Sequence, residues 1–327
     1  MENGELGTPF SVFRFPLSTM HLGDYRIEII PDAEFRLDGG AMFGVVPRVL
    51  WERVCPADEL NRIKLNMNCL FVETPDEKIL IETGIGEKWT AKELSIHGIF
   101  REKPFAQSLF EITGCRPEDI TIVVNTHLHF DHAGGNTKAE PPASAGGTSW
   151  TDIQLDPISS ARPPAYAGGS AIMPQFPNAR YLVSKSEFEH AERPHERDRA
   201  SYLSANWHSL SETRQLELKP NNYEVVEGLR IEQVRGHSET MQTIRLDRGG
   251  ETLFGFYDMI PTRHHLPLPW IMSYDLFPTE TLEFKKRILS RAVDENWICL
   301  FYHDFEMPLC RLIEVDGKIT AVEYVEV

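Results

Sequence analysis

The apolar and polar positions of this chain predict a succession of short strands separated by helices. Residues 24–30 and 63–73 alternate between apolar and polar side chains, which is typical of strands with one covered face. Residues 120–124 (ITIVV) are apolar apart from one threonine and predict a strand that is buried on both faces. The other predicted strands are residues 78–83, 180–184, 229–234, 242–246, 252–258 and 297–303, with a closing hairpin across Asp316-Gly317-Lys318.

Helical patterns fill the intervals between these strands. Apolar residues at mixed spacings of three and four predict a helix over residues 279–293, and shorter helices are expected at residues 104–112 and 186–192. A polar helix is expected over about residues 196–216. Strands interleaved with helices along the whole chain, without internal repeats, predict a single α/β domain of residues 1–327 with a layered sheet core.

One segment departs from this pattern. Residues 137–178 contain AEPPASAGG, ARPPAYAGGS and MPQFPN, and are rich in Pro, Gly, Ala and Ser. Such a composition does not bury enough apolar surface to order itself. We therefore expect a long surface insertion, and the sequence leaves open whether it is a functional lid or a disordered segment.

The composition disfavours several classes of function. The 33 basic and 49 acidic residues give a net charge of −16, which repels phosphate backbones and anionic lipid, so we expect neither nucleic-acid nor membrane binding. The N-terminal sequence MENGELGTPFSVFRF lacks the pattern of a signal peptide, and no apolar run approaches the ~20 residues that span a bilayer. Five scattered cysteines without a C-x-x-C pair indicate reduced thiols, so a cytoplasmic protein is expected.

The strand at residues 120–124 leads into a dense group of potential metal ligands, THLHFDHAGG. Positions two apart on a strand face the same side, so His127 and His129 point the same way, and Asp131 and His132 follow at once. Gly134 and Gly135 allow another backbone to pass close by. Imidazole and carboxylate ligands together suit zinc, manganese or iron, with zinc the default for sites rich in histidine.

Three more candidates end later predicted strands. His237 follows the strand at 229–234, Asp258 ends the strand at 252–258, and His303 ends the strand at 297–303. Taken singly, each is equally well explained as a hydrogen-bonded surface residue. Because α/β sheets collect their ligands at the carboxyl ends of strands, their shared position predicts that they complete the site.

This order of motifs resembles the metallo-β-lactamase superfamily, from about residue 60 to residue 305. The closest pattern is the lactonase and organophosphorus-hydrolase-like branch. The resemblance implies a four-layer αββα sandwich with a two-metal site at one edge. It implies one metal held by His127, His129 and His237, another held by Asp131, His132 and His303, and Asp258 bridging them.

Two positions depart from the family pattern. Glu82 stands where the family usually has an aspartate that supports the metal ligands, so the longer side chain is expected to change how those ligands are held. Met241 stands where many relatives carry a second histidine, which removes one outer contact.

The resemblance implies a hydrolase that uses two divalent metal ions, zinc by default with iron or manganese as alternatives. Our hypothesis is that a metal-bridging hydroxide attacks the carbonyl of a small-molecule ester or lactone, with phosphotriesters as side substrates. Asp131 would carry the proton to the leaving group. The alternatives are a glyoxalase II-like thioester hydrolase, an iron-dependent sulfur dioxygenase-like redox enzyme, or a binding protein on an inactive hydrolase scaffold.

Substrate contacts are harder to predict. Lactonases of this family place a tyrosine shortly after the bridging aspartate, and residues 259–270 contain none. His264 and His265 are candidate substrate contacts, with an exposed loop as the alternative. Phe43 is a candidate for an apolar substrate pocket, with core packing as the alternative. A homodimer is also compatible with the sequence.

Overall fold

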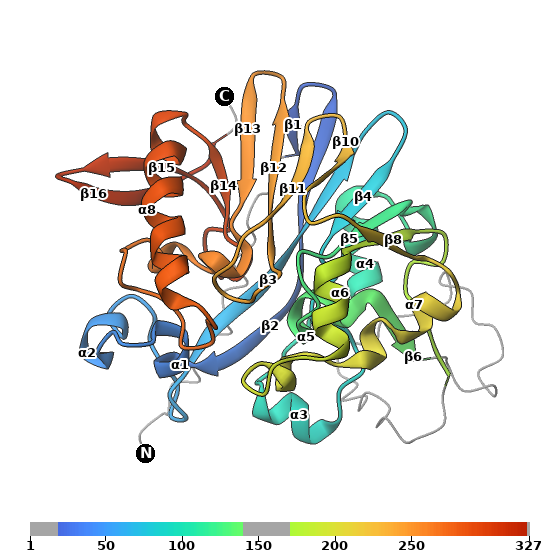
Figure 1. Ribbon diagram of the computed structural model, residues 1–327, viewed down its shortest axis with the longest axis horizontal. Helices are drawn as coiled ribbons and strands as arrows, with labels where there is room; N and C mark the ends of the chain where they lie inside the picture. The colour runs from blue at the N-terminus through green and yellow to red at the C-terminus, as the bar shows by residue number, and fades with distance from the viewer. Residues whose placement is uncertain (1–18, 140–170, 326–327) are drawn as a thin grey trace, which may run out of the picture.

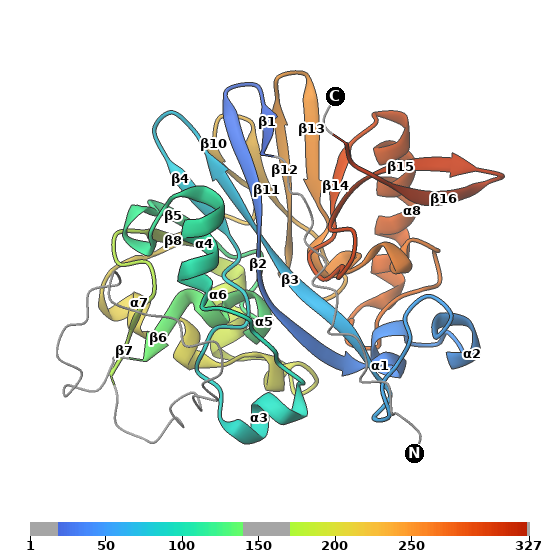
Figure 2. The same cartoon turned by 180° about the vertical axis from the view of Figure 1, so that it is seen from behind.

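Two large sheets form the centre of the molecule. The computed structural model describes residues 19–139 and 171–325. Figures 1 and 2 show the two sheets packed side by side, with α8 on one side and α4, α5, α6 and α7 on the other. The described part of the chain therefore has the layer order α, β, β, α that was predicted.

The first sheet has seven strands in the order β1-β2-β3-β4-β5-β8-β9. Neighbouring strands from β4 to β9 in this order run parallel. Neighbouring strands from β1 to β4 pair antiparallel. The strands are Met20–Leu22 (β1), Tyr25–Asp38 (β2), Arg62–Glu73 (β3), Lys78–Ile81 (β4), Ile122–Val124 (β5), Arg180–Ser184 (β8) and Leu216–Lys219 (β9).

The second sheet also has seven strands, in the sequential order β10 to β16. Its only parallel pair is β13 with β14, within the part of the chain that the structure describes. The strands are Tyr223–Val226 (β10), Leu229–Gln233 (β11), Gln242–Arg248 (β12), Glu251–Gly255 (β13), Ile298–Leu300 (β14), Leu309–Val315 (β15) and Lys318–Glu323 (β16).

Short helices and turns connect these strands. The α-helices are Gly39–Phe43 (α1), Arg48–Trp51 (α2), Ala91–Ile96 (α3), Phe105–Thr113 (α4), Phe130–Ala133 (α5), Lys185–Glu192 (α6), His208–Glu212 (α7) and Pro278–Asp294 (α8). The 3₁₀ turns are Pro117–Asp119 (η1), Gly134–Asn136 (η2), Arg199–Ser201 (η4), Ser204–Asn206 (η5), Tyr257–Met259 (η6) and Arg263–His265 (η7).

The parallel strands determine where the polar motifs meet. β5 is buried along its whole length and lies between β4 and β8, as its continuous β-branched sequence predicts. The carboxyl ends of β4 and β5 share one edge of the first sheet, and those of β13 and β14 share one edge of the second. Residues that follow these strands are therefore brought together.

The predicted polar helix over residues 196–216 is wrong. The segment forms the separate short pieces η4, η5 and α7 instead. Its buried aromatic residues are Tyr202 and Trp207, five positions apart, which do not share one helical face. The backbone of Tyr202 pairs with His129 as an isolated antiparallel bridge, and this pairing is incompatible with a continuous helix.

Other differences are smaller. The predicted strand at 252–258 ends at Gly255, and Asp258 lies in the turn η6. The segment between β2 and β3 folds into α1 and α2. The edge strands β9 and β10 and the helix α3 were not predicted. For α3 a signal exists, because Thr90 and Glu93 form a capping box.

The predicted insertion at 137–178 lies mostly outside the described residues. Its two ends form a small antiparallel sheet of Thr137–Ala139 (β6) and Ile172–Pro174 (β7). The N-terminal segment considered for a signal peptide also lies outside them. Over residues 19–139 and 171–325, no helix is both long enough and apolar enough to cross a bilayer.

Candidate metal centre

The seven predicted ligands lie together at one edge of the paired sheets. They come from five places along the chain: the loop that follows β5, the helix α5, the loop that follows β11, the turn η6 and the segment that follows β14. Each is buried, with at most 6% of its surface exposed. They are His127, His129, Asp131, His132, His237, Asp258 and His303.

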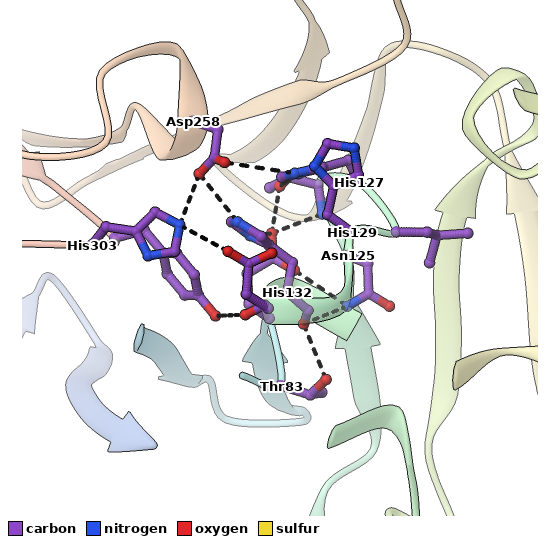
Figure 3. Close-up of polar contacts among 12 residues, drawn as sticks. Thr83, Asn125, His127, His129, His132, Asp258 and His303 are labelled. Atoms are coloured by element: carbon purple, nitrogen blue, oxygen red, sulfur yellow. Dashed lines mark hydrogen bonds and ion pairs between the residues drawn. The ribbon is translucent and has the colours of Figure 1, made fainter. Parts of the chain in front are cut away.

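The Asp258 carboxylate lies between two groups of imidazoles. Its Oδ1 is 3.1 Å from Nε2 of His132 and 3.1 Å from Nε2 of His303. Its Oδ2 is 3.3 Å from Nε2 of His237 and 3.9 Å from Nε2 of His127. Figure 3 shows Asp258, His132 and His303 pointing toward one another. Each oxygen therefore faces a different group of candidate ligands.

These side chains form overlapping sets whose ligand atoms all lie within 4.8 Å of one another. The sets are His127, His129, His237 and Asp258; Asp131, His132 and His303; and Glu82, His127 and His132. Glu82 is already bonded to the backbone and hydroxyl of Thr126, so we regard it as a support rather than a ligand.

The donor atoms fit a cation. Among the described residues, no hydrogen bond of normal geometry satisfies the buried atoms His127 Nε2, His132 Nε2 and Asp258 Oδ1, although the last two lie 3.1 Å apart. Buried polar atoms without partners are rare and costly, so a group of them that converge on one volume indicates a bound ion. Imidazole nitrogen and carboxylate oxygen are ligands of zinc and of other divalent transition metals.

The electrostatics of the cluster keep these atoms available. Burial and the neighbouring imidazoles lower the pKa of His127 and of His129 well below the ordinary range, so both are neutral. Burial alone raises the pKa of Asp258, but His132 and His303 face it and hold its pKa well below the usual range. Asp258 is therefore a carboxylate between neutral and cationic imidazoles.

The pKa values of two other imidazoles shift in the opposite direction. Burial lowers the pKa of His132 and of His237, but the facing Asp258 carboxylate outweighs it and raises the pKa of both. A divalent cation held by these residues would take the place of these protons, because metal ligation requires the neutral imidazole.

Outer contacts orient several of the imidazoles. Nδ1 of His303 lies 2.9 Å from the carbonyl of Asn66, which fixes Nδ1 as the protonated nitrogen and leaves Nε2 toward Asp258. Nδ1 of His237 lies 3.0 Å from the carboxylate of Asp275, which in turn accepts the hydroxyl of Thr281 at 2.6 Å. Asn66, Asp275 and Thr281 have no motif of their own in the sequence, and sequence reasoning missed them.

Glu82 supports the loop that carries the first histidines. Its carboxylate accepts the backbone N–H of Thr126 at 3.0 Å and the side-chain amide of Asn125 at 3.2 Å. Its Oε1 also lies 3.4 Å from Nδ1 of His132. Glu82 has a φ of 63°, a conformation that non-glycine residues rarely adopt. The longer side chain thus reaches the ligand loop from a strained backbone.

The two glycines after the motif allow the close backbone approach that was predicted. A Cβ on Gly134 would lie 2.1 Å from the carbonyl oxygen of Ile85, and one on Gly135 would lie 2.1 Å from that of Thr83. The loop after β4 therefore packs directly against the end of the motif, which brings Glu82 into range.

Two of the three predicted substrate contacts are buried. Phe43 and His265 are 0% and 1% exposed and stack on one another with ring centroids 4.7 Å apart. His265 also lies 2.9 Å from the carbonyl of Met42 and 2.8 Å from the hydroxyl of Thr262. In this conformation neither residue offers a surface to a substrate, and Phe43 corresponds to the core-packing alternative.

His264 is partly buried, and the Arg263 beside it binds Asp304. Met241 is fully buried in the core, which accounts for an apolar residue at this position.

Comparison with known proteins finds a family match in the first half of the chain. Residues 63–140 match the family model described as metallo-beta-lactamase superfamily. The chain carries a metallo-beta-lactamase superfamily domain. This match covers β3 from its second residue, the strands β4, β5 and β6, and the whole H-x-H-x-D-H motif.

Relatives and solved structures agree with the metallo-beta-lactamase assignment. The chain is 24% identical to an N-acyl homoserine lactonase of Bacillus cereus over 258 residues, which is 75% of this chain and 84% of that lactonase. It superposes on a probable metal-dependent hydrolase from Staphylococcus aureus with a TM-score of 0.77 and 27% identity, covering 94% of this chain and 100% of the other.

A further solved structure shares the metallo-beta-lactamase fold. The dizinc quorum-quenching lactonase AidC, in complex with a product, gives a TM-score of 0.69 at 17% identity and covers 95% of this chain and 98% of that one. The predicted fold is confirmed, and so is the enzyme class of a metal-dependent, lactonase-like hydrolase.

Proposed function

We propose that this protein is a dinuclear metal-dependent hydrolase that opens lactones and cleaves esters. The observation that carries the proposal is the position of Asp258, whose two oxygens each face a separate group of candidate ligands. A carboxylate placed in this way suits two cations that share one ligand.

The proposed ligands follow from the same geometry. His127, His129 and His237 lie on the Oδ2 side of Asp258, and their set is buried and closely spaced. Asp131, His132 and His303 lie on the Oδ1 side. We propose zinc as the default metal, with iron or manganese as alternatives.

Two divalent ions at such a site supply Lewis acidity and lower the pKa of water. The protein's own groups orient the reaction. Tyr302 donates its hydroxyl to the backbone carbonyl of Asp131 at 2.8 Å, which fixes the start of α5. The Asp131 carboxylate lies 3.5 Å from Nε2 of His303, at the centre of the site, and is placed to hold the proton that the leaving alkoxide takes up.

A neutral lactone or ester suits the charge of the chain better than a polyanion does. The net charge of −16 repels phosphate-rich substrates. Several relatives of this chain are named N-acyl homoserine lactonases, so N-acylated lactones are the first class to test. Phosphotriesters stay in the proposal as side substrates. A cytoplasmic location and a homodimer stay predictions from the sequence.

The test is a substrate screen on metal-free and reconstituted protein. We expect zinc-reconstituted protein to hydrolyse N-acyl lactones and aryl esters, with release of acid followed by a pH indicator, and to lose this rate on chelation. A rate that survives chelation contradicts the proposal. Preference for glutathione thioesters over lactones would favour the glyoxalase II-like alternative, and oxygen uptake with iron would favour the dioxygenase-like one.

A further inference from the structure

Glu187 is a buried carboxylate that contacts two of the ligand-bearing loops. It lies on α6 with none of its surface exposed. One carboxylate oxygen accepts the backbone N–H of Leu128 at 2.7 Å, between the first two histidines of the motif. The other accepts the hydroxyl of Thr240, three residues after His237. One side chain therefore joins the loop after β5 to the loop after β11.

The helix α6 does not need this carboxylate for its own start. Ser184 is the N-cap, and its Oγ accepts the backbone N–H of Glu187 at 3.1 Å. The sequence Ser184-Lys185-Ser186-Glu187 matches a capping box, in which the glutamate would return to the backbone of the N-cap. In this structure the carboxylate points away to Leu128 and Thr240 instead.

Burial of the Glu187 carboxylate disfavours its charged form. Removal from water raises the pKa of Glu187, although its hydrogen bonds from Thr240 and Leu128 lower it in part. Nearby, Tyr202 packs against the ring of His129 with centroids 4.7 Å apart. Glu187 thus lies among residues that pack against the candidate metal ligands.

We propose that Glu187 is a positioning residue that sets the relative placement of His127, His129 and His237. This inference rests on the metal site of the proposed function. Leu128 is the residue between His127 and His129, so a hydrogen bond to its N–H restrains the backbone that carries both imidazoles. Outer partners of metal ligands typically contribute roughly 10–100-fold to metal affinity.

A second contact joins the same loops and keeps them in place without Glu187. The backbone N–H of Gln242 donates to the carbonyl of Thr126 at 3.1 Å. We therefore expect the Glu187→Ala variant to fold, and to show its defect in the placement of the imidazoles.

The test compares Glu187→Ala with Glu187→Gln, Thr240→Val and the control Glu189→Ala. Glu189 lies on the same helix, and its side chain is 65% exposed. Metal-free proteins are titrated with Zn²⁺ against a chromophoric chelator, and with Co²⁺ by visible absorption. We expect Glu187→Ala to weaken Zn²⁺ binding by about 10–100-fold and to change the Co²⁺ spectrum, while Glu189→Ala matches the wild type.

The conservative variant separates positioning from general damage. The amide of Glu187→Gln can still accept from Leu128 and donate to Thr240, so most of the affinity should return. The Thr240→Val variant should lose part of the Zn²⁺ affinity. If Glu187→Ala does not fold, as judged by far-ultraviolet circular dichroism, Thr240→Val decides: weakened Zn²⁺ binding supports the inference, and unchanged binding overturns it.

The inference is overturned if Glu187→Ala binds Zn²⁺ and Co²⁺ like Glu189→Ala. It is also overturned if the variant loses only stability while its metal affinity stays at the wild-type value. A wild-type protein that binds no divalent ion would instead contradict the proposed function itself.

Discussion

Glu82 and Glu187 accept hydrogen bonds from the backbone N–H groups of the two residues on either side of His127. Glu82 binds Thr126 at 3.0 Å, and Glu187 binds Leu128 at 2.7 Å. The two carboxylates come from opposite sides of β5, one from the end of β4 and one from α6. The two carboxylates thus hold the backbone on both sides of His127, independently of any bound ion.

Removal of Glu82 should destabilise the metal-free protein. Glu82→Ala leaves the buried N–H of Thr126 without its acceptor, which costs about 1–3 kcal/mol, and leaves the amide of Asn125 only its 3.4 Å contact with the carbonyl of His132. Glu82→Asp should show a smaller loss, because the shorter side chain reaches only part of this set. Urea unfolding of the metal-free proteins measures the effect, with the exposed Glu87→Ala as control. A loss within about 0.5 kcal/mol of the control would contradict this role.

Asp258 is the residue on which the two proposed metals depend together. Asp258→Asn keeps the size of the side chain and removes its charge. Since loss of an outer partner alone costs roughly 10–100-fold in metal affinity, we expect a loss greater than about 100-fold here. Zn²⁺ titration against a chelator measures it, and Asp294→Asn on the exposed end of α8 is the matched control. Two ions bound with wild-type affinity would exclude Asp258 as a shared ligand.

Phe43 should behave as a core residue. It stacks on His265 and on Trp51, with ring centroids 4.7 and 5.4 Å away, and is fully buried. Phe43→Ala should therefore lower the free energy of unfolding by about 3–5 kcal/mol, as large-to-small changes in cores do. Phe43→Leu should retain most of the stability and leave KM for lactones unchanged. A large rise in KM for Phe43→Leu at full stability would show a substrate contact instead.

The pair of His190 and Asp198 should make stability depend on pH. Nε2 of His190 lies 2.8 Å from Asp198, and this hydrogen bond raises the pKa of His190. A raised folded-state pKa means that the contribution of the pair is complete below the ordinary value of about 6.5 and is lost as pH rises through the raised value. The stability difference between wild type and His190→Gln should therefore shrink from about pH 5.5 to about pH 8.5. Urea unfolding across this range measures it, and a difference that grows with pH would contradict the assignment.

The local motif and its fold could be predicted from the sequence because the signals are short in range. A buried β-branched strand followed at once by His127, His129, Asp131 and His132 contains its own structural context. The distant candidates His237, Asp258 and His303 could be predicted only from their shared position at strand ends, and the structure places all three in the cluster.

The supporting contacts could not be predicted, because they join positions far apart along the chain. Asp275 is 38 residues from His237, Glu187 is 59 residues from Leu128, and Asn66 is 237 residues from His303. Asp275 and Asn66 have no spacing pattern that marks them, and the capping-box spacing of Glu187 predicts a different contact from the one it makes. The failed helix over 196–216 has the same origin, since the pairing of Tyr202 with His129 overrides a local preference.

The dinuclear centre is tested most directly by anomalous X-ray diffraction from crystals of the zinc-reconstituted protein, recorded on both sides of the zinc absorption edge. We predict two anomalous peaks, one on each side of the Asp258 carboxylate and about 3.5–4 Å apart. The first should lie among His127, His129 and His237, and the second among Asp131, His132 and His303. A single peak at full zinc occupancy, or none within this cluster, would contradict the account.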